Sequence, residues 1–293
     1  MLKNKKEELK KPYIMILGSA QDGGYPMAIC KKVCCKNAVL KNEKPTRVSC
    51  IALVDPISSE QWIIDATPDL KEQLNELYKQ SKSEKINGIF LTHAHIGHYL
   101  GLAQLGQEVI GSKKIKVYCM RRMFDFLSNN GPWDQLIRLK NITLEKIRNE
   151  LTIKLNSRIS ITPILVPHRD EYSETVCYLV STMKKKLLYI PDIDKWHLWD
   201  KDIKEMIKIV DYALLDGTFY QDGELSRDMS KIPHPFVKES MMLFKDLSKQ
   251  NKQKVFFTLL NHTNPLIIKE SKEQFEVKKL GFNFAVDNLV LEL

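Results

Sequence analysis

The stretch "LTHAHIGHYLGL", residues 91–102, places three of the chain's seven histidines within six positions, with the spacing H-x-H-x-x-H. It continues an apolar run, "INGIFLT", that is typical of a buried strand. His93 and His95 share one face because side chains of alternate residues point the same way, and His98 can approach from the other side. Imidazole nitrogens are preferred ligands of Zn²⁺ and similar ions. The stretch therefore predicts a metal site where a strand ends.

Other ionisable side chains also follow apolar runs. His168 ends "ITPILVP", Asp192 ends "LLYIP", Asp216 ends "YALLD", and His262 closes "VFFTLLN". In α/β folds the sheet provides rigidity and the loops after its strands carry the chemistry. We therefore expect these side chains to gather at one edge.

Composition limits the possible partners. The 293 residues are 43% hydrophobic and carry a formal charge of +9, but lysines alternate with acids, as on solvated faces. We expect a small-molecule substrate rather than nucleic acid. No apolar run approaches the ~20 residues of a membrane span, and no apolar leader-like run occurs at the start, which predicts no membrane partner and a cytoplasmic location. A mature exported protein would have the same pattern, and the oligomeric state is left open.

The order of elements predicts one α/β domain over residues 13–293, preceded by a charged segment at 1–12. Helical spacing occurs at 67–80 and 200–210. Strand-like runs rich in β-branched residues occur at 13–20, 47–54, 62–66, 86–94, 114–120, 159–168, 175–182, 186–193, 211–219, 254–263 and 284–293.

The motif "THAHIGH" resembles the H-x-H-x-D-H pattern of the metallo-β-lactamase superfamily, and "LLYIPD" and "LVPHRDEYSETVCYLV" resemble further elements of it. Within the superfamily, the chain is similar to the pyrroloquinoline quinone biosynthesis protein B group. That likeness rests on "LGSAQDGGYP" with the cysteine-rich loop after it, "PHRDEYSETV", "LLDGTF" and "NHTNPL". The resemblance implies an α/β fold, the metallo-β-lactamase αβ/βα four-layer sandwich, with metal at the sheets' common edge.

The resemblance also implies a first metal at His93, His95 and His168, with Asp192 as fourth ligand or water-orienting base. Such a site lowers the pKa of a bound water to about 7, which suits hydrolysis. Zn²⁺ is expected, as one or two ions, and Fe and Mn are the alternatives. Asp192 and His98 are the predicted catalytic residues.

Two positions depart from the family pattern. The aspartate that would bind a second metal is replaced by Gly97, and the last family histidine aligns with Leu259. Glycine has no side chain and cannot ligate. We expect one tightly held metal, while His98 and His262 hold a weaker second one or bind substrate.

The cysteines are unevenly placed, and Cys30, Cys34 and Cys35 crowd one loop. They resemble the structural-zinc cysteines of related hydrolases, although the usual C-x-C-x₂-C spacing is not kept. Adjacent cysteines can bind one ion, and we expect His234 as the fourth ligand. The alternative is a loop of reduced thiols.

Substrate contacts are predicted around the loop after His168. Arg169 suits an anionic substrate group, and Asp170 or Glu171 could orient His168 through its free ring nitrogen. Three further residues complete the predicted substrate-binding set, namely Tyr172, Asp216 and Asn264.

These features predict a metal-dependent hydrolase that activates water against a small-molecule ester, amide or phosphoester. One alternative is a phosphodiesterase acting on RNA or cyclic nucleotides. Another is a non-catalytic binding or carrier protein with a degenerate metal site, and a His-rich site with a carboxylate also suits non-haem iron chemistry.

Overall fold

Two seven-stranded sheets make up the centre of the computed structural model, which describes residues 10–293. Most of the predicted charged segment, residues 1–9, lies outside the described residues. The first sheet has the order β14-β1-β2-β3-β4-β5-β6. Its strands are β1 (Tyr13–Gly18), β2 (Cys50–Asp55), β3 (Glu60–Ile64), β4 (Gly88–Phe90), β5 (Ile115–Cys119), β6 (Ile142–Lys146) and β14 (Val290–Glu292).

The second sheet has the order β13-β12-β11-β10-β9-β8-β7. Both sheets are mixed, and the pairs β3–β4 and β10–β11 are parallel. Its strands are β7 (Ile153–Lys154), β8 (Ile159–Leu165), β9 (Val176–Thr182), β10 (Lys186–Ile190), β11 (Tyr212–Asp216), β12 (Val255–Thr258) and β13 (Asn283–Phe284).

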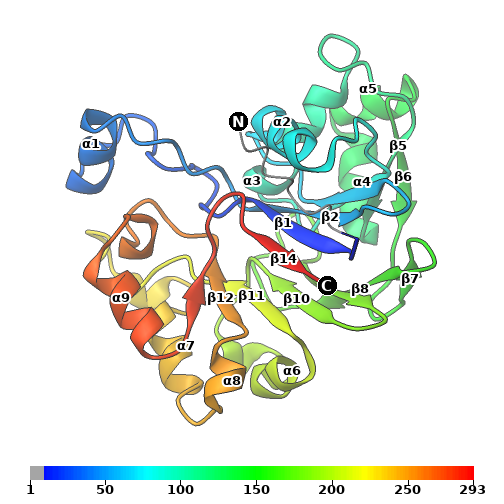
Figure 1. Cartoon of the computed structure of the whole chain (residues 1–293). Helices are drawn as coiled ribbons and strands as arrows, with labels where there is room; N and C mark the ends of the chain where they lie inside the picture. The colour runs from blue at the N-terminus through cyan, green and yellow to red at the C-terminus, as the bar shows by residue number, and fades with distance from the viewer. Residues whose placement is uncertain (1–9) are drawn as a thin grey trace, which may run out of the picture.

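Helices cover the outer face of each sheet, so the layers run helix, sheet, sheet, helix (Figure 1). This confirms the predicted αβ/βα sandwich. None of these helices combines the length and apolar character needed to cross a membrane. The α-helices are α1 (Val33–Leu40), α2 (Leu70–Ser81), α3 (Ile96–Tyr99), α4 (Arg121–Asn129), α5 (Trp133–Arg138), α6 (Ile203–Ile209), α7 (Val237–Leu243), α8 (Lys249–Lys252) and α9 (Lys272–Lys279), and the 3₁₀ helices are η1 (Leu100–Leu105), η2 (Trp196–Leu198), η3 (Met229–Lys231) and η4 (Pro265–Ile267).

The two sheets pack face to face through one apolar cluster. Ile14 and Leu53 of the first sheet and Val180 of the second are each fully buried there. Phe90 stacks on Tyr118 with ring centroids 4.3 Å apart and meets Tyr178 edge-on. Each such side chain stabilises the fold by roughly 1.5–3 kcal/mol through removal from water. This core holds the strand ends of both sheets in fixed register.

The strand predictions differ from the structure in two places. Strands β6 and β7 were not predicted, because "ITLEK" is partly exposed and β7 has only two residues. The final run 284–293 is not one strand. It divides into the end of β13, in the second sheet, and β14, which pairs with β1 in the first.

The predicted metal loop is joined to the second sheet by direct hydrogen bonds. The Tyr178 hydroxyl of β9 donates to the Leu91 carbonyl oxygen at 2.6 Å, and the Val176 backbone N–H donates to the Thr92 oxygen at 3.1 Å. Both acceptors lie immediately before His93. The loop position is therefore set by the distant strand β9 as much as by β4.

Replacing Tyr178 with Phe should destabilise the protein by about 1–3 kcal/mol, because the buried Leu91 carbonyl loses its donor while the ring volume is kept. Urea unfolding at equilibrium measures the change. The matched control is Tyr78→Phe on α2, whose side chain is 47% exposed and whose change should stay within about 0.5 kcal/mol. Equal effects of the two substitutions would show that the hydroxyl of Tyr178 contributes nothing specific.

Candidate metal centre

Four predicted metal ligands converge at the common edge of the sheets. One ligand atom from each of His93, His95, His168 and Asp192 lies within 4.8 Å of the other three. His93, His168 and Asp192 are buried, whereas the side chain of His95 keeps 17% of its surface exposed. The four residues come from the ends of β4, β8 and β10. The structure therefore brings together the ligand set that the sequence predicted.

Carboxylates lie behind the rings of His95 and His168. His168 Nδ1 lies 3.0 Å from Asp194 Oδ1, and His95 Nε2 lies 3.3 Å from Glu171 Oε2. When each of these nitrogens donates a proton to its carboxylate, the other ring nitrogen is left with a lone pair that can bind a metal. These two inner atoms, His168 Nε2 and His95 Nδ1, lie 3.3 Å apart.

A buried hydrogen-bond network also orients the ring of His93. Asp65, at the end of β3, accepts the Thr92 hydroxyl proton at 2.9 Å and lies 2.8 Å from His98 Nδ1. Because that hydroxyl has one proton, it can only accept from His93 Nδ1, which is 2.9 Å away. His93 thus turns an Nε2 lone pair toward Asp192, whose Oδ2 also lies 3.1 Å from His98 Nε2. Asp65 and Asp194 were missed by the sequence analysis because each lies far along the chain from the histidine that it contacts, and Thr92 was missed because its role depends on Asp65.

The electrostatics of the centre suit a divalent cation. Burial and the neighbouring His98 lower the pKa of His93 well below its ordinary value. Although burial opposes its charge, the histidines around Asp192, above all His98 and His93, hold the pKa of that carboxyl well below its usual range. Within residues 10–293, His93 Nε2, His98 Nε2 and Asp192 Oδ2 are buried without a hydrogen-bond partner. Such atoms are costly unless an ion or water meets them, so these residues fit a bound metal.

His234 lies in this centre and not in the cysteine loop, which corrects the predicted fourth cysteine-site ligand. Its Nδ1 is 2.7 Å from Asp216 Oδ2, and its ring centroid is 5.2 Å from that of His168. Burial alone would lower the pKa of His234, but the Asp216 carboxylate outweighs it and raises that pKa to about 9. The imidazolium is thereby held beside Asp192.

Asp216 itself has no free oxygen for a substrate. Oδ2 accepts from the Ile193 N–H as well as from His234, and Oδ1 accepts from the backbone and hydroxyl of Thr218. Its predicted substrate-binding role is therefore wrong, since this carboxylate orients His234 instead.

His262 occupies the place that the sequence analysis gave to His234. Its Nδ1 lies 3.7 Å from Cys30 Sγ, 3.8 Å from Cys34 Sγ and 3.4 Å from Cys35 Sγ. A tetrahedral zinc with Zn–S bonds of about 2.3 Å has ligand–ligand edges of roughly 3.5–3.8 Å. The four side chains therefore fit a structural zinc that would fasten α1, at the margin of the molecule, to the loop after β12 (Figure 1).

With His262 in that cluster, the family histidine missing at Leu259 is not replaced. Leu259 is fully buried with a φ of 58°, and it directs no polar group to the centre. The expectation that His262 assists the active site is wrong, because its ring is turned to the three thiols.

The predicted substrate residues divide into two groups. Arg169 and Tyr172 are exposed on the loop after His168, where Arg169 lies near Glu171 and the Tyr172 ring contacts Phe126 of α4, and their substrate role stays a prediction. Asn264 is fully buried, donates to the Gly217 carbonyl oxygen and accepts from the Leu266 N–H. Its predicted substrate role is wrong, because both ends of its amide hold a turn. Asp170 pairs with Arg122 instead of orienting His168.

Comparison with known proteins agrees with this geometry. A family model described as the β-lactamase superfamily domain matches residues 61–257, more than half of the chain. The chain belongs to the metallo-β-lactamase superfamily. Coenzyme PQQ synthesis protein B of Pseudomonas entomophila is 28% identical to it, over 96% of this chain and 100% of that protein. The protein of the same name from Pseudomonas putida GB-1 is 27% identical over the same shares.

Solved structures share the fold. The Zn²⁺-bound PqqB from Methylobacterium extorquens superposes with a TM-score of 0.81 at 24% identity and covers 96% of this chain and 100% of its own. A diphosphatase from the PhnP family superposes with a TM-score of 0.69 at 19% identity, covering 97% of each chain. At these identities the likeness extends to the fold, and the chemistry has to be argued from this chain's own residues.

Two separate losses of metal should follow from substitutions of His93 and His262. His93→Ala should remove the ion of the Asp192 centre, and His262→Ala should remove the ion of the cysteine cluster, because each takes one ligand from a different group. Elemental analysis of the purified variants measures both, and His197→Ala, at an exposed position on η2, is the control that keeps all metal. A double variant that loses no more metal than either single one would contradict the separation.

Proposed function

We propose that this protein is a metal-dependent hydrolase acting on a small-molecule ester, amide or phosphoester. The observation that carries the proposal is the convergence of His93, His95, His168 and Asp192, with one ligand atom of each within 4.8 Å of the others. A Zn²⁺ ion held by these residues would supply Lewis acidity and a water whose pKa is lowered to about 7. Fe and Mn suit the same donor atoms.

Two further roles in hydrolysis, orienting the water and donating a proton, are assigned to Asp192 and His234. Asp192 Oδ2, ionised and without a hydrogen-bond partner among residues 10–293, would hold and orient the attacking water. His234, kept charged by Asp216, would give its proton to the departing oxygen or nitrogen as the scissile bond breaks. The water supplies the new bond to the acyl or phosphoryl centre, and its released proton balances the one that His234 gives up.

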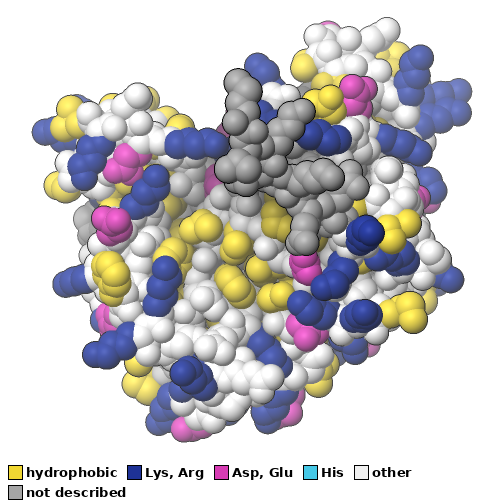
Figure 2. Space-filling model, viewed as in Figure 1, with side chains coloured by type: hydrophobic (Ala, Val, Ile, Leu, Met, Phe, Trp, Pro, Cys, Tyr) yellow, Lys and Arg dark blue, Asp and Glu magenta, His cyan; other side chains and the backbone are white. Residues whose placement is uncertain are grey.

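A small substrate is supported by the surroundings of the centre. The partly exposed His95 belongs to it, and the exposed Arg169 on the loop after His168 can pair with an anionic group. The face drawn in Figure 2 shows lysine and arginine side chains scattered, with acidic ones between them. Because lysines alternate with acids along the sequence, we rank a small molecule above RNA as the substrate. The six free cysteines support a reducing, cytoplasmic environment.

A second candidate function is a binding or carrier role in coenzyme PQQ synthesis or a related pathway. The observation that favours it is the likeness to coenzyme PQQ synthesis protein B over 96% of this chain. In that case the same cluster holds metal and ligand without turnover.

The effect of substituting His234 should depend on the leaving group of the substrate. His234→Gln should lower kcat/KM about 10²–10⁴-fold for an ester with an alkoxide leaving group, which needs a proton. It should change little for bis-p-nitrophenyl phosphate or a p-nitrophenyl ester, whose leaving group departs as an anion. Steady-state kinetics of the zinc-loaded protein measures both, and Asp192→Asn should impair all substrates.

His197→Gln is the matched control and should leave every rate unchanged. If the zinc-loaded wild-type protein cleaves none of these esters, nor amides or lactones, while still binding metal at His93, the carrier role replaces the hydrolase.

A further inference from the structure

Gly97 stands at the position where the superfamily pattern has a metal-binding aspartate. The carboxylate of another residue occupies the space that the aspartate side chain would fill. A Cβ atom added to Gly97 would lie 2.2 Å from Asp22 Oδ1 and 2.7 Å from Asp22 Cγ. Real Cβ atoms do not approach other atoms so closely. Asp22, 75 positions earlier in the loop after β1, therefore fills the place that a residue-97 side chain would take.

We propose that Asp22 supplies the carboxylate that Gly97 lacks, so that Asp22, His98 and Asp192 form a second cation site. The inference rests on the proposed function to the extent that Asp192 is shared with the three-histidine centre. It replaces the expectation that the glycine simply removes a ligand.

The atoms that face each other support this set. His98 Nε2 lies 3.5 Å from Asp22 Oδ1 and 3.1 Å from Asp192 Oδ2. His98 is fully buried, and its other nitrogen is engaged by Asp65, so Nε2 is its free ligand atom. Neither Nε2 nor Asp192 Oδ2 has a hydrogen-bond partner of suitable geometry within residues 10–293.

The negative charge around His98 also favours a bound cation. Three carboxylates, from Asp22, Asp65 and Asp192, face this one imidazole. A divalent ion at Nε2 would balance the charge of these carboxylates.

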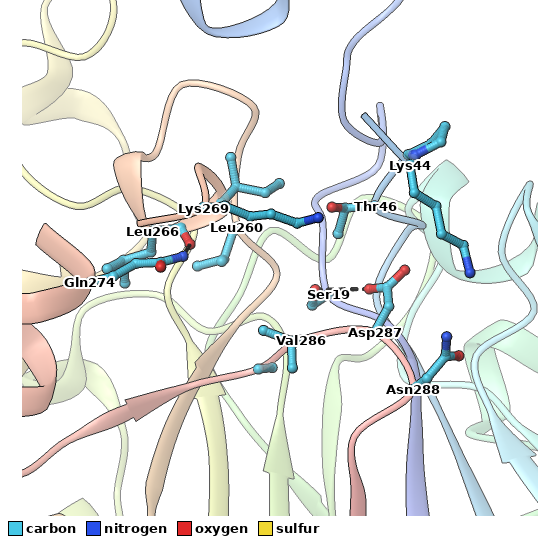
Figure 3. A pocket seen from close by; sticks show the side chains of 13 residues that line it. Ser19, Lys44, Thr46, Leu260, Leu266, Lys269, Gln274, Val286, Asp287 and Asn288 are labelled. Carbon is cyan, nitrogen blue, oxygen red and sulfur yellow. Dashed lines mark hydrogen bonds between the residues drawn. The ribbon is translucent and has the colours of Figure 1, made fainter. Parts of the chain in front are cut away.

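The loop that carries Asp22 is fixed on both sides, as a ligand requires. Ala20 bridges Val48 on one side and Leu260 on the other, and the Gln21 N–H donates to the Leu260 oxygen at 2.9 Å. Figure 3 shows a further contact of this loop, beside a cavity of about 200 Å³. There the Ser19 hydroxyl donates a hydrogen bond to Asp287 Oδ1 at 3.0 Å. The position of Asp22 is thus determined by both sheets.

The ligand chemistry predicts which ion prefers this site. Two carboxylates and one imidazole form a harder donor set than three imidazoles and one carboxylate, and such sets suit Mn²⁺. No histidine replaces Leu259 among the described residues, so the site has three protein ligands and should bind more weakly than the first.

The experiment starts from protein that holds zinc in the three-histidine and cysteine clusters, after weakly bound metal has been removed with a mild chelator. Mn²⁺ is then titrated, and the electron paramagnetic resonance signal of free Mn²⁺ gives the stoichiometry and Kd. The wild-type chain should bind one further Mn²⁺. Asp22→Asn should raise the Kd at least ~10-fold, because loss of even an outer-shell partner costs that much.

A swap separates ligation from folding. Asp22→Gly should lose the Mn²⁺, and adding Gly97→Asp to it should restore binding, because the new side chain enters the space that Asp22 left. The matched control is Asp170→Asn, an exposed carboxylate near the same centre, which should bind as the wild type does.

Unchanged Mn²⁺ binding in Asp22→Asn, or no recovery in the swapped variant, would overturn the proposal. So would a wild-type chain that binds no Mn²⁺ beyond its zinc. In each case zinc retained at His93 and ester cleavage would leave the proposed hydrolase standing, so the two failures are distinguishable.

Discussion

The inner nitrogens of His93, His95 and His168 lie close to one another and to the Asp192 carboxylate. Their outer nitrogens lie against other groups: those of His95 and His168 against Glu171 and Asp194, and that of His93 against the Thr92 hydroxyl. A bound cation would meet the inner nitrogens and the carboxylate together. The energetic cost of leaving such groups unpaired, about 1–3 kcal/mol each, makes metal binding part of the stability of this edge as well as of its chemistry.

The fold maintains this constraint because the orienting groups belong to different strands from the ligands. Asp65 follows β3 and sets both His93 and His98, which follow β4. Tyr178 of the second sheet holds the carbonyl just before the loop. Parallel strands end at the same edge, so these residues meet only once both sheets have packed. The rigid background is the apolar cluster between the sheets.

The sequence predicted those parts of the site that depend on the spacing of nearby residues. Histidine spacing and position after apolar runs drew attention to His93, His95, His168 and Asp192, and the order of strands and helices predicted an α/β domain. The resemblance to the superfamily implied that the four residues share one metal and that the domain is a four-layer sandwich. His234 and His262 were assigned to each other's sites, because both lie in loops whose return path depends on long-range packing. Asp65, Asp194 and Asp22 were missed for the same reason, since each acts on a residue far away in the chain.

The comparison proteins include both a coenzyme PQQ synthesis protein and a diphosphatase with the same fold. In this chain Asp22 fills the space beside Gly97, and His262 lies against the cysteine loop. The superfamily fold thus brings the strand ends to a common edge of the two sheets, and we infer that individual loop residues determine how many ions bind there.

Anomalous diffraction from crystals of the zinc-loaded protein, recorded on both sides of the zinc absorption edge, tests the central claim directly. The account predicts one zinc peak within bonding distance of His93 Nε2, His95 Nδ1 and His168 Nε2, beside Asp192, and a separate peak among the three cysteines and His262. Zinc bound elsewhere, with no peak among the three inner nitrogens, would contradict it.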